Sequence, residues 1–165
     1  MENLLILGAG GYGRVIRELA ADSGAFADIA FLDDANGQAL GKLCEYERFL
    51  PQYRFAYAAL GNNLLRVDWL RRLLAAGFLL PTFVHPRAYV SPSASIEPGT
   101  AVLANATVCA GARIFTGAII NAGAIADHDC ILNEGVHLAP GAVVKANCVL
   151  ERLAKVESGE VVFNI

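Results

Sequence analysis

Apolar residues recur at every sixth position over the second half of the chain. Three places after most of them comes Gly, Asn or Asp, and these residue types tolerate the left-handed backbone that a sharp corner requires. A hexapeptide period with a corner in each repeat is typical of a parallel β-helix, in which three repeats close one triangular coil of 18 residues. The apolar series comprises Val90, Ile96, Val102, Val108, Ile114, Ile120, Ala126, Leu132, Leu138, Val144, Leu150, Val156 and Val162, and the corner residues include Gly99, Asn105, Gly111, Gly117, Gly123, Asp129, Gly135, Gly141 and Asn147.

The same period predicts two columns of aliphatic side chains on the outside of the β-helix. Residues 18 apart stack in neighbouring coils, so Ile125, Val143 and Val161 form one column, and Ile131 and Val149 form another. Continuous exposed apolar columns usually mark an association surface. Because threefold assembly suits a triangular prism, we expect a homotrimer. Ordinary surface aliphatics are the alternative.

Residues 1–83 show a different pattern, in which short apolar strands alternate with helices. Strands are expected at 4–7, 29–34 and 55–60, and this alternation indicates a small parallel sheet with crossover helices. The second helix is expected to begin after Asn62 or Asn63 and to end at Gly77, residue types that favour helix termini. The change of pattern predicts two domains, residues 1–83 and 84–165. The predicted buried faces are Val15, Ile16, Leu19 and Ala20 in the first helix, and Leu65, Trp69, Leu70, Leu73 and Leu74 in the second.

Composition places the excess of apolar residues between subunits. Apolar residues make up 55% of the chain and the mean hydropathy is +0.44. No apolar stretch approaches the roughly 18–20 residues that cross a bilayer, so no membrane insertion is expected. The first residues lack both the basic leader and the continuous apolar run of a signal peptide, which predicts a cytoplasmic location.

Charge and cysteine content indicate which partners and which cysteine chemistry to expect. The net charge is −3 with scattered basic residues, which argues against nucleic acid as the main partner. The four cysteines form no C-x-x-C pair. Cys130 and Cys148 occupy the same repeat position in neighbouring coils, and we expect reduced thiols in the core there.

A glycine-rich loop marks a candidate nucleotide site in the first domain. Gly8, Gly10 and Gly13 match G-x-G-x-x-G, follow a strand and open a helix, where backbone N–H groups can meet a phosphate. Asp33 and Asp34 end the next strand, where an acid could bond a ribose or base. Only half of a doubly wound sheet fits in 83 residues, so a nucleotide or nucleotide sugar is expected rather than NAD. A purely structural glycine turn is the alternative.

Only three histidines are available for acid–base chemistry. His128 stands between Asp127 and Asp129 in an outward corner, and a neighbouring carboxylate would raise the basicity of the imidazole and select its tautomer. A general base is therefore predicted there, with a solvated surface histidine as the alternative. His137 faces outward and could approach a neighbour's groove in a trimer, whereas His85 is expected to be a packed linker residue.

Nearly the whole chain resembles the bacterial nucleotide-sugar acetyltransferases, which include sialic acid O-acetyltransferases and UDP-4-amino-sugar N-acetyltransferases. The stretch NAGAIADHDCILNEGVHLAPGA (121–142) is the most specific part of the likeness; GAGGYG, FLDD, ALGNN and FVHPRAYVSPSA also match. The resemblance implies an α/β Rossmann-like domain followed by a left-handed parallel β-helix. It also implies a homotrimer with sites between subunits.

The resemblance also implies roles for particular residues. His128 matches the catalytic base of the family, and Asp129 matches the acid that tunes it. His137 matches a histidine that contacts acetyl-CoA. The sugar-nucleotide site would be lined by Gly11, Tyr12, Gly13, Asp33, Asp34 and Gly61. Tyr12 stands where this loop often carries histidine.

These inferences together predict an acetyl-CoA-dependent transferase that acetylates an amino or hydroxyl group of a sugar, expected to be a nucleotide-activated amino sugar. Family members usually carry further coils that help to hold coenzyme A, which keeps a non-catalytic nucleotide-sugar-binding trimer as an alternative. A zinc-dependent β-helix lyase is a second alternative. It would need ligands from a neighbouring chain, because no spacing here stacks two histidines, and we expect no metal.

Overall fold

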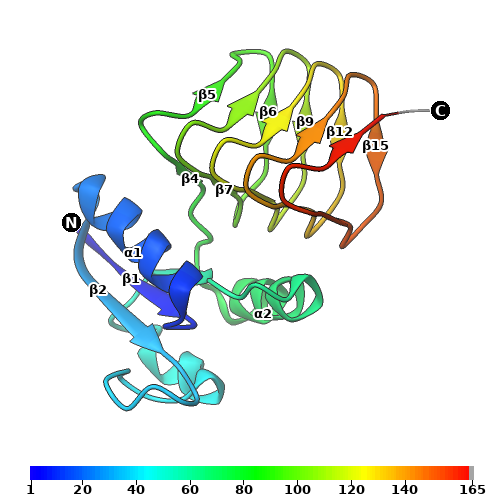
Figure 1. Ribbon diagram of the computed structural model, residues 1–165. Coiled ribbons are helices and arrows are strands. Elements are labelled where there is room, and N and C mark those ends of the chain that lie inside the picture. Colours follow the sequence, from blue (N-terminus) through cyan, green and yellow to red (C-terminus); the bar gives the residue numbers. More distant parts are fainter. Residues whose placement is uncertain (164–165) are drawn as a thin grey trace. The chain divides into compact units, whose positions relative to one another are not determined.

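The computed structural model describes residues 1–163 and divides the chain into two compact units. The first, Met1–Pro81, is called the α/β unit here, and the second, Thr82–Ile165, the β-helix unit (Figure 1). An α/β domain is followed by many short parallel strands in stacked sheets. The predicted fold class, a Rossmann-like domain followed by a left-handed β-helix, is confirmed.

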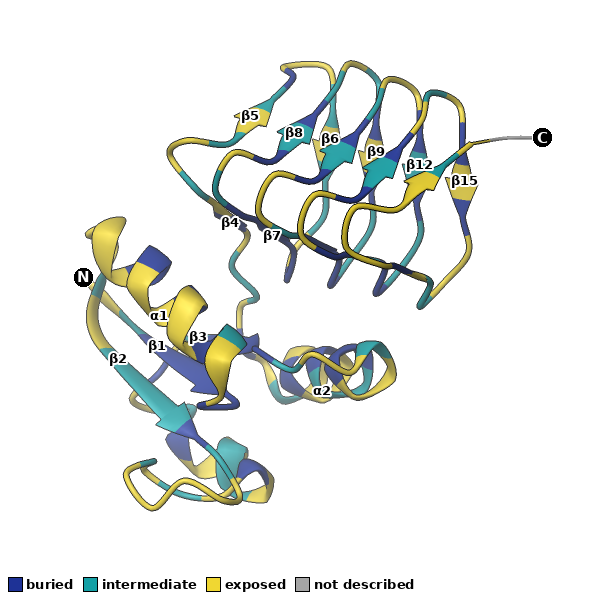
Figure 2. Ribbon diagram, viewed as in Figure 1, coloured by how far each residue is buried: buried dark blue, intermediate teal, exposed yellow. Residues whose placement is uncertain are grey.

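The α/β unit is built on three parallel strands in the order β2-β1-β3. The central strand is buried along most of its length, whereas β2 is only partly buried (Figure 2). A central parallel strand covered on both faces favours a continuous apolar run, which is why residues 4–7 read LLIL. The elements are β1 (Glu2–Leu7), α1 (Gly11–Asp22), β2 (Phe26–Leu32), the 3-10 helix η1 (Leu43–Phe49), β3 (Phe55–Ala58) and α2 (Asn63–Ala76).

Local signals set both ends of α2 as predicted. Asn62 caps α2 by accepting a hydrogen bond from the Leu65 backbone N–H at 3.0 Å, and Gly77 ends it with φ of 100°. Helix α1 buries Ile16, Leu19 and Ala20, but its predicted Val15 is 43% exposed. Gly13 takes the remaining place on the buried face, because a Cβ there would overlap the carbonyl of Gly8.

The predicted buried face of α2 was partly wrong. Leu65 and Leu74 are 51% and 61% exposed, and Trp69 is half-buried. The buried residues are Arg66, Val67, Leu70 and Leu73. A helix with leucines on several sides does not define a single apolar stripe. Arg66 is buried because its guanidinium finds two hydrogen-bond acceptors, the Leu60 carbonyl in the preceding loop and Oδ1 of Asn63 at the start of α2.

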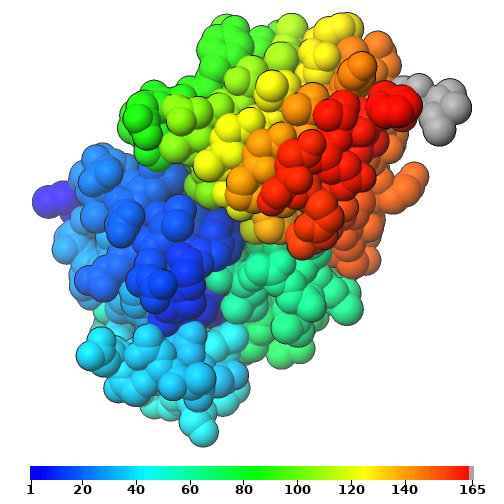
Figure 3. Space-filling view, viewed as in Figure 1, coloured from blue at the N-terminus to red at the C-terminus, as the bar shows by residue number. Residues whose placement is uncertain are grey.

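The β-helix unit consists of two-residue strands that stack in three parallel sheets, and each strand pairs with the one 18 residues ahead, as Ile120 does with Leu138. The predicted apolar series fills the interior, where residues from Val102 to Val144 in that series are at most 1% exposed. In the space-filling view the coils follow one another as bands of colour (Figure 3). The strands are β4 (Phe83–Val84), β5 (Tyr89–Val90), β6 (Ser95–Ile96), β7 (Ala101–Val102), β8 (Thr107–Val108), β9 (Arg113–Ile114), β10 (Ile119–Ile120), β11 (Ile125–Ala126), β12 (Ile131–Leu132), β13 (His137–Leu138), β14 (Val143–Val144), β15 (Val149–Leu150), β16 (Lys155–Val156) and β17 (Val161–Val162).

The predicted corners and columns are also present. Every predicted corner residue has a positive φ, including the non-glycine Asp129 at 59°. Ile125, Val143 and Val161 pair in register along one sheet, and Ile131 pairs with Val149 on another. The trimer that these columns suggest stays a prediction.

Two further expectations can be compared with the described residues. Cys130 and Cys148 are buried free thiols, as expected for core positions. Burial raises the pKa of Cys130 to about 12, with a smaller contribution from Cys148. Between residues 1 and 163, no helix has the length and apolar character that a membrane span requires.

Candidate active site

His128 and Asp129 form a hydrogen-bonded pair at the corner between β11 and β12. The Nδ1 atom of His128 lies 2.9 Å from Oδ2 of Asp129. Adjacent side chains on a straight strand point to opposite sides, so this contact depends on the corner, where Asp129 has φ of 59°. Both side chains are more than half exposed, at 54% and 60%. The corner geometry expected from the repeat is therefore present.

The stacked coil beneath fixes the backbone of Asp129 and leaves room for its carboxylate. The Asp129 backbone N–H donates to the Ala110 carbonyl at 2.9 Å. Gly111 occupies the same corner one coil earlier, and a Cβ there would overlap Oδ1 of Asp129. Gly111 therefore makes room for the carboxylate. Sequence reasoning assigned Gly111 only a corner role, although its 18-residue offset from Asp129 was a usable signal.

The electrostatics of the corner favour a basic imidazole. The hydrogen bond that His128 donates to Asp129 raises the pKa of His128; desolvation opposes this, and the charges of Asp127 and Asp129 add to the rise. Asp127 also accepts a hydrogen bond from the His128 backbone N–H at 2.7 Å. An ionised carboxylate only accepts hydrogen bonds, so Nδ1 carries the proton toward Asp129. Nε2 is then the atom that can take up a proton.

The other two histidines lie elsewhere on the β-helix unit. His137 is half-buried on β13, in the sheet β16-β13-β10-β7-β4, with Nε2 3.4 Å from the side-chain nitrogen of Asn121. The Nδ1 atom of His85 accepts a hydrogen bond from the Arg87 backbone N–H at 3.0 Å, within the first coil. His128, by contrast, forms its pair with the carboxylate of Asp129.

A shallow surface hollow of about 750 Å³ lies on the β-helix unit next to the His128 corner. Its wall includes the apolar column residues Ile125 and Val143, together with the charged side chains of Asp127 and Lys145. Asp127 therefore contacts both the hollow and the His128 backbone. An apolar wall with one cation at its edge can accept a ligand with an aliphatic part and an anionic part.

In the α/β unit, the glycine-rich loop divides into structural and open positions. Gly8 has φ of 100°, and a Cβ there would lie 2.9 Å from the Ala59 carbonyl, so the fold itself requires Gly8 as well as Gly13. Gly10 and Gly11 have nothing within 4 Å of an added Cβ. A structural turn therefore explains Gly8 and Gly13. Gly10 and Gly11 are not needed for packing, and because they lack side chains the N-terminus of α1 is open, which is a typical position for a phosphate.

The two aspartates after β2 hold the loops at the same edge of the sheet. Oδ2 of Asp33 accepts from the Ala9 N–H at 2.7 Å, and Oδ1 accepts from Ala35 and Asn36 at 2.9 Å each. These bonds, led by that from Ala9, lower the pKa of Asp33. Oδ1 of Asp34 accepts from the Leu43 N–H at 3.0 Å. The two carboxylates that were predicted to contact a nucleotide are therefore bound to backbone N–H groups, and they order the loops at this edge of the sheet.

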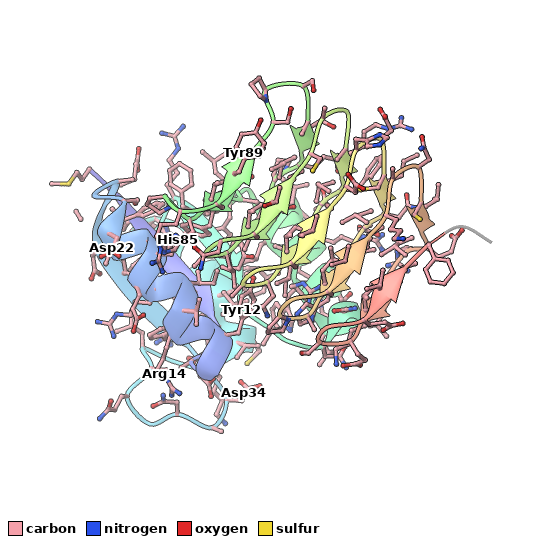
Figure 4. The ribbon with its side chains drawn as sticks, turned by 45° about the horizontal axis from the view of Figure 1, so that its top comes forward. Tyr12, Arg14, Asp22, Asp34, His85 and Tyr89 are labelled. Carbon is pink, nitrogen blue, oxygen red and sulfur yellow. The ribbon has the colours of Figure 1, made fainter. Side chains whose placement is uncertain are left out.

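Two hollows flank Ala9 on the α/β unit, with volumes of about 520 and 250 Å³. Figure 4 shows Tyr12, Arg14 and Asp34 together at the N-terminal end of α1, with Asp22 at the other end. Sequence reasoning missed Arg14, Arg17 and Asn36 as lining residues. The position of Arg14 in the first turn of α1 was the available signal. The larger hollow is lined by Ala9, Gly10, Asp33, Ala35, Asn36 and Gly37, and the smaller by Ala9, Arg14, Arg17, Phe31, Asn36, Gln38 and Ala39.

The parallel sheet brings the predicted acceptor residues to one edge. Gly11 to Gly13 follow β1, Asp33 and Asp34 follow β2, and Gly61 follows β3. Leu7 pairs in register with Leu32 and Ala58, so the carboxyl ends of the three strands lie side by side. Ligands of open α/β sheets bind outside this edge. Among residues 1–163, no group of three or more His, Cys, Asp or Glu side chains is arranged to hold a metal ion.

Comparison with known proteins identifies the family. The model of the PglD N-terminal domain family matches residues 3–73. The acetyltransferase domain of PglB from Neisseria gonorrhoeae, solved with acetyl coenzyme A, is 36% identical with a TM-score of 0.81, and the match covers 97% of this chain and 87% of that one. PerB from Caulobacter crescentus, solved with CoA and GDP-perosamine, is 30% identical with a TM-score of 0.86, over 99% of this chain and 89% of that one.

A mutant of perosamine N-acetyltransferase from Caulobacter crescentus, also solved with CoA and GDP-perosamine, is 27% identical. Its TM-score is 0.92, and the match covers 99% of this chain and 89% of that one. No curated protein sequence matches this chain. The family resemblance seen in the sequence is confirmed, and the chain belongs to the left-handed β-helix family of sugar acetyltransferases.

Proposed function

We propose that this protein transfers the acetyl group of acetyl-CoA to the amino group of a nucleotide-linked amino sugar. The observation that carries the proposal is the exposed, hydrogen-bonded His128–Asp129 pair. The relatives solved with acetyl coenzyme A, or with CoA and GDP-perosamine, support the classes of donor and acceptor. The name perosamine N-acetyltransferase supports an amino group rather than a hydroxyl group as the acceptor.

In the proposed reaction His128 acts as the general base. Nε2 takes a proton from the neutral amine as its nitrogen attacks the thioester carbonyl, so that a C–N bond forms. The C–S bond then breaks, and the leaving thiolate receives the proton from His128, which gives free coenzyme A and the amide. Asp129 holds the proton on Nδ1 and stabilises the imidazolium that forms between these steps.

The acceptor would bind to the α/β unit through Gly11, Tyr12, Gly13, Asp33, Asp34 and Gly61. The open N-terminus of α1 suits the anionic phosphates of a nucleotide. His137 would contact acetyl-CoA. The apolar columns would form the interface of a homotrimer, and the protein would act in the cytoplasm.

The test is transfer of radiolabelled acetyl from acetyl-CoA to a panel of UDP- and GDP-linked amino sugars. We expect acetylation of at least one panel member, and a loss of activity in His128→Ala. The matched control is His85→Ala, which removes a histidine from a turn of the same unit. Binding of the sugar nucleotides without transfer would instead support the non-catalytic nucleotide-sugar-binding alternative.

A further inference from the structure

A polar cluster in the α/β unit, formed by the half-buried Tyr12 and the buried Tyr57 and Arg66, joins two of the segments that carry the proposed acceptor residues. The hydroxyl oxygens of Tyr12 and Tyr57 lie 2.7 Å apart, and their rings meet edge to face with centroids 6.4 Å apart. Tyr57 and Arg66 are both 0% exposed. Burial lowers the pKa of Arg66, and its electrostatic interaction with Tyr12 and Tyr57 acts in the opposite direction. The cluster thus connects α1, β3 and α2.

Arg66 also holds the turn between β3 and α2. Its Nη1 donates to the Leu60 carbonyl at 2.9 Å, and its Nη2 donates to Oδ1 of Asn63 at 2.9 Å. Gly61, which follows Leu60, is one of the proposed acceptor residues. The guanidinium therefore fixes the carbonyl directly before Gly61.

Packing alone does not require an arginine at this position. Burying a guanidinium costs free energy unless hydrogen bonds compensate it, and buried ionic groups can often be replaced by apolar ones without loss of stability. Leucines occur elsewhere on α2, and several of them, such as Leu65 and Leu74, are exposed. The cluster is therefore better explained by the geometry that it imposes than by the stability that it adds.

The geometry in question is that of the two segments that follow β1 and β3. Tyr12 lies in the first turn of α1. Its neighbours Gly11 and Gly13 have no side chains that could anchor this turn. Its hydroxyl contact with Tyr57 anchors this turn to β3, while Arg66 anchors the turn at Leu60. Displacing a binding loop by about 1 Å can cost up to about 100-fold in rate.

We propose that Tyr12, Tyr57 and Arg66 are positioning residues, which hold the N-terminus of α1 and the Leu60–Gly61 turn at the separation that a nucleoside-diphosphate sugar requires. This inference rests on the proposed function, in which the α/β unit binds the acceptor. In this arrangement the backbone of Tyr12 would face the acceptor, while its side chain contacts Tyr57.

The experiment compares Tyr12→Phe, Tyr57→Phe and Arg66→Met with Arg72→Met, a control on the same helix whose side chain is 54% exposed. Calorimetry measures binding of UDP, GDP, dTDP and CMP, and steady-state kinetics measures KM for each substrate. We expect the three cluster variants to bind the nucleotide about 10- to 100-fold more weakly than the wild type. Their KM for the sugar nucleotide should rise by a similar factor. KM for acetyl-CoA should stay within about twofold, and Arg72→Met should resemble the wild type.

The outcomes separate this inference from the proposed function. Unchanged nucleotide binding in the two Tyr→Phe variants would overturn the inference and leave the proposed function intact. An equal rise in KM for both substrates, with a lowered Tm, would show a merely structural role and would also overturn it. If the wild type binds none of the four nucleotides, the proposed acceptor site is wrong and this inference falls with it. If Arg66→Met does not fold, the two Tyr→Phe variants decide.

Discussion

The two units differ in how closely local sequence determines the surroundings of each residue. In the β-helix unit, the place of a residue in its hexapeptide decides whether it points inward, and the whole series from Val102 to Val144 is buried as its phase predicts. In the α/β unit, the same type of reasoning placed Leu65 and Leu74 in the core, and both are exposed. A repeating fold gives each repeat the same neighbours, whereas a helix on a sheet buries whichever face its particular neighbours cover.

The chemistry of the two units follows the same division. The His128–Asp129 pair is made by two consecutive residues at a corner. The proposed acceptor residues come from the ends of three strands, and the Tyr12–Tyr57 contact spans 45 positions. A single substitution should therefore have a local and predictable effect in the β-helix unit, and an effect carried through packing in the α/β unit.

The largest expected effect is the loss of the general base. His128→Ala should lower kcat about 10²–10⁴-fold, because proton abstraction is lost. Since the side chain is 54% exposed, the free energy of unfolding should change by no more than about 0.5 kcal/mol. His137→Ala should instead raise KM for acetyl-CoA more than it lowers kcat. Near-normal kcat in His128→Ala at neutral pH would disprove the assignment of the base.

The glycine-rich loop allows the next comparison, between Gly13→Ala and Gly11→Ala. The Cβ of Gly13→Ala would overlap the Gly8 carbonyl, whereas nothing lies within 4 Å of the added Cβ in Gly11→Ala. Overpacking of this kind costs about 1–3 kcal/mol, so Gly13→Ala should lower the free energy of unfolding measured in urea. Gly11→Ala should keep stability and weaken nucleotide binding by calorimetry. Equal stability of the two variants would contradict the structural role of Gly13.

A pair of corner glycines tests whether the coil beneath Asp129 matters. Gly111→Ala and Gly123→Ala place the same side chain at φ of 68° and 67°, so each should cost about 1–2 kcal/mol of stability. Only at Gly111 does the added Cβ meet the Asp129 carboxylate; at Gly123 nothing lies within 4 Å. Gly111→Ala should therefore lose more kcat/KM than Gly123→Ala at equal folded fraction. Equal activities would show that Asp129 tolerates displacement.

The smallest effect is a shift in pH dependence. A general base works in its neutral form, so kcat/KM should fall as the pH drops through the pKa of His128. The hydrogen bond to Asp129 raises this pKa above the ordinary value of 6.5, so activity should be lost at a higher pH than for an isolated imidazole. Asp129→Asn should move this acidic limb to lower pH. Asn fits the corner, since Asn105 and Asn147 have the same positive φ, and an unmoved limb would exclude Asp129 as the tuning group.

The sequence by itself determined the β-helix, its corners and its catalytic candidate. Each of these depends on residues a few positions apart. The hexapeptide period specifies which side chains point inward, and Asp129 at a corner position brings its carboxylate beside His128. The glycine pattern before α1 and the caps of α2 at Asn62 and Gly77 were readable for the same reason.

Only the tertiary structure decided the features that depend on distant segments. The buried face of α2, the bond from Ala9 to Asp33 and the Tyr12–Tyr57–Arg66 cluster each depend on residues from different helices, strands or loops. No local pattern predicts such contacts, because their free energy depends on which groups the folded chain brings together and which of them lose water.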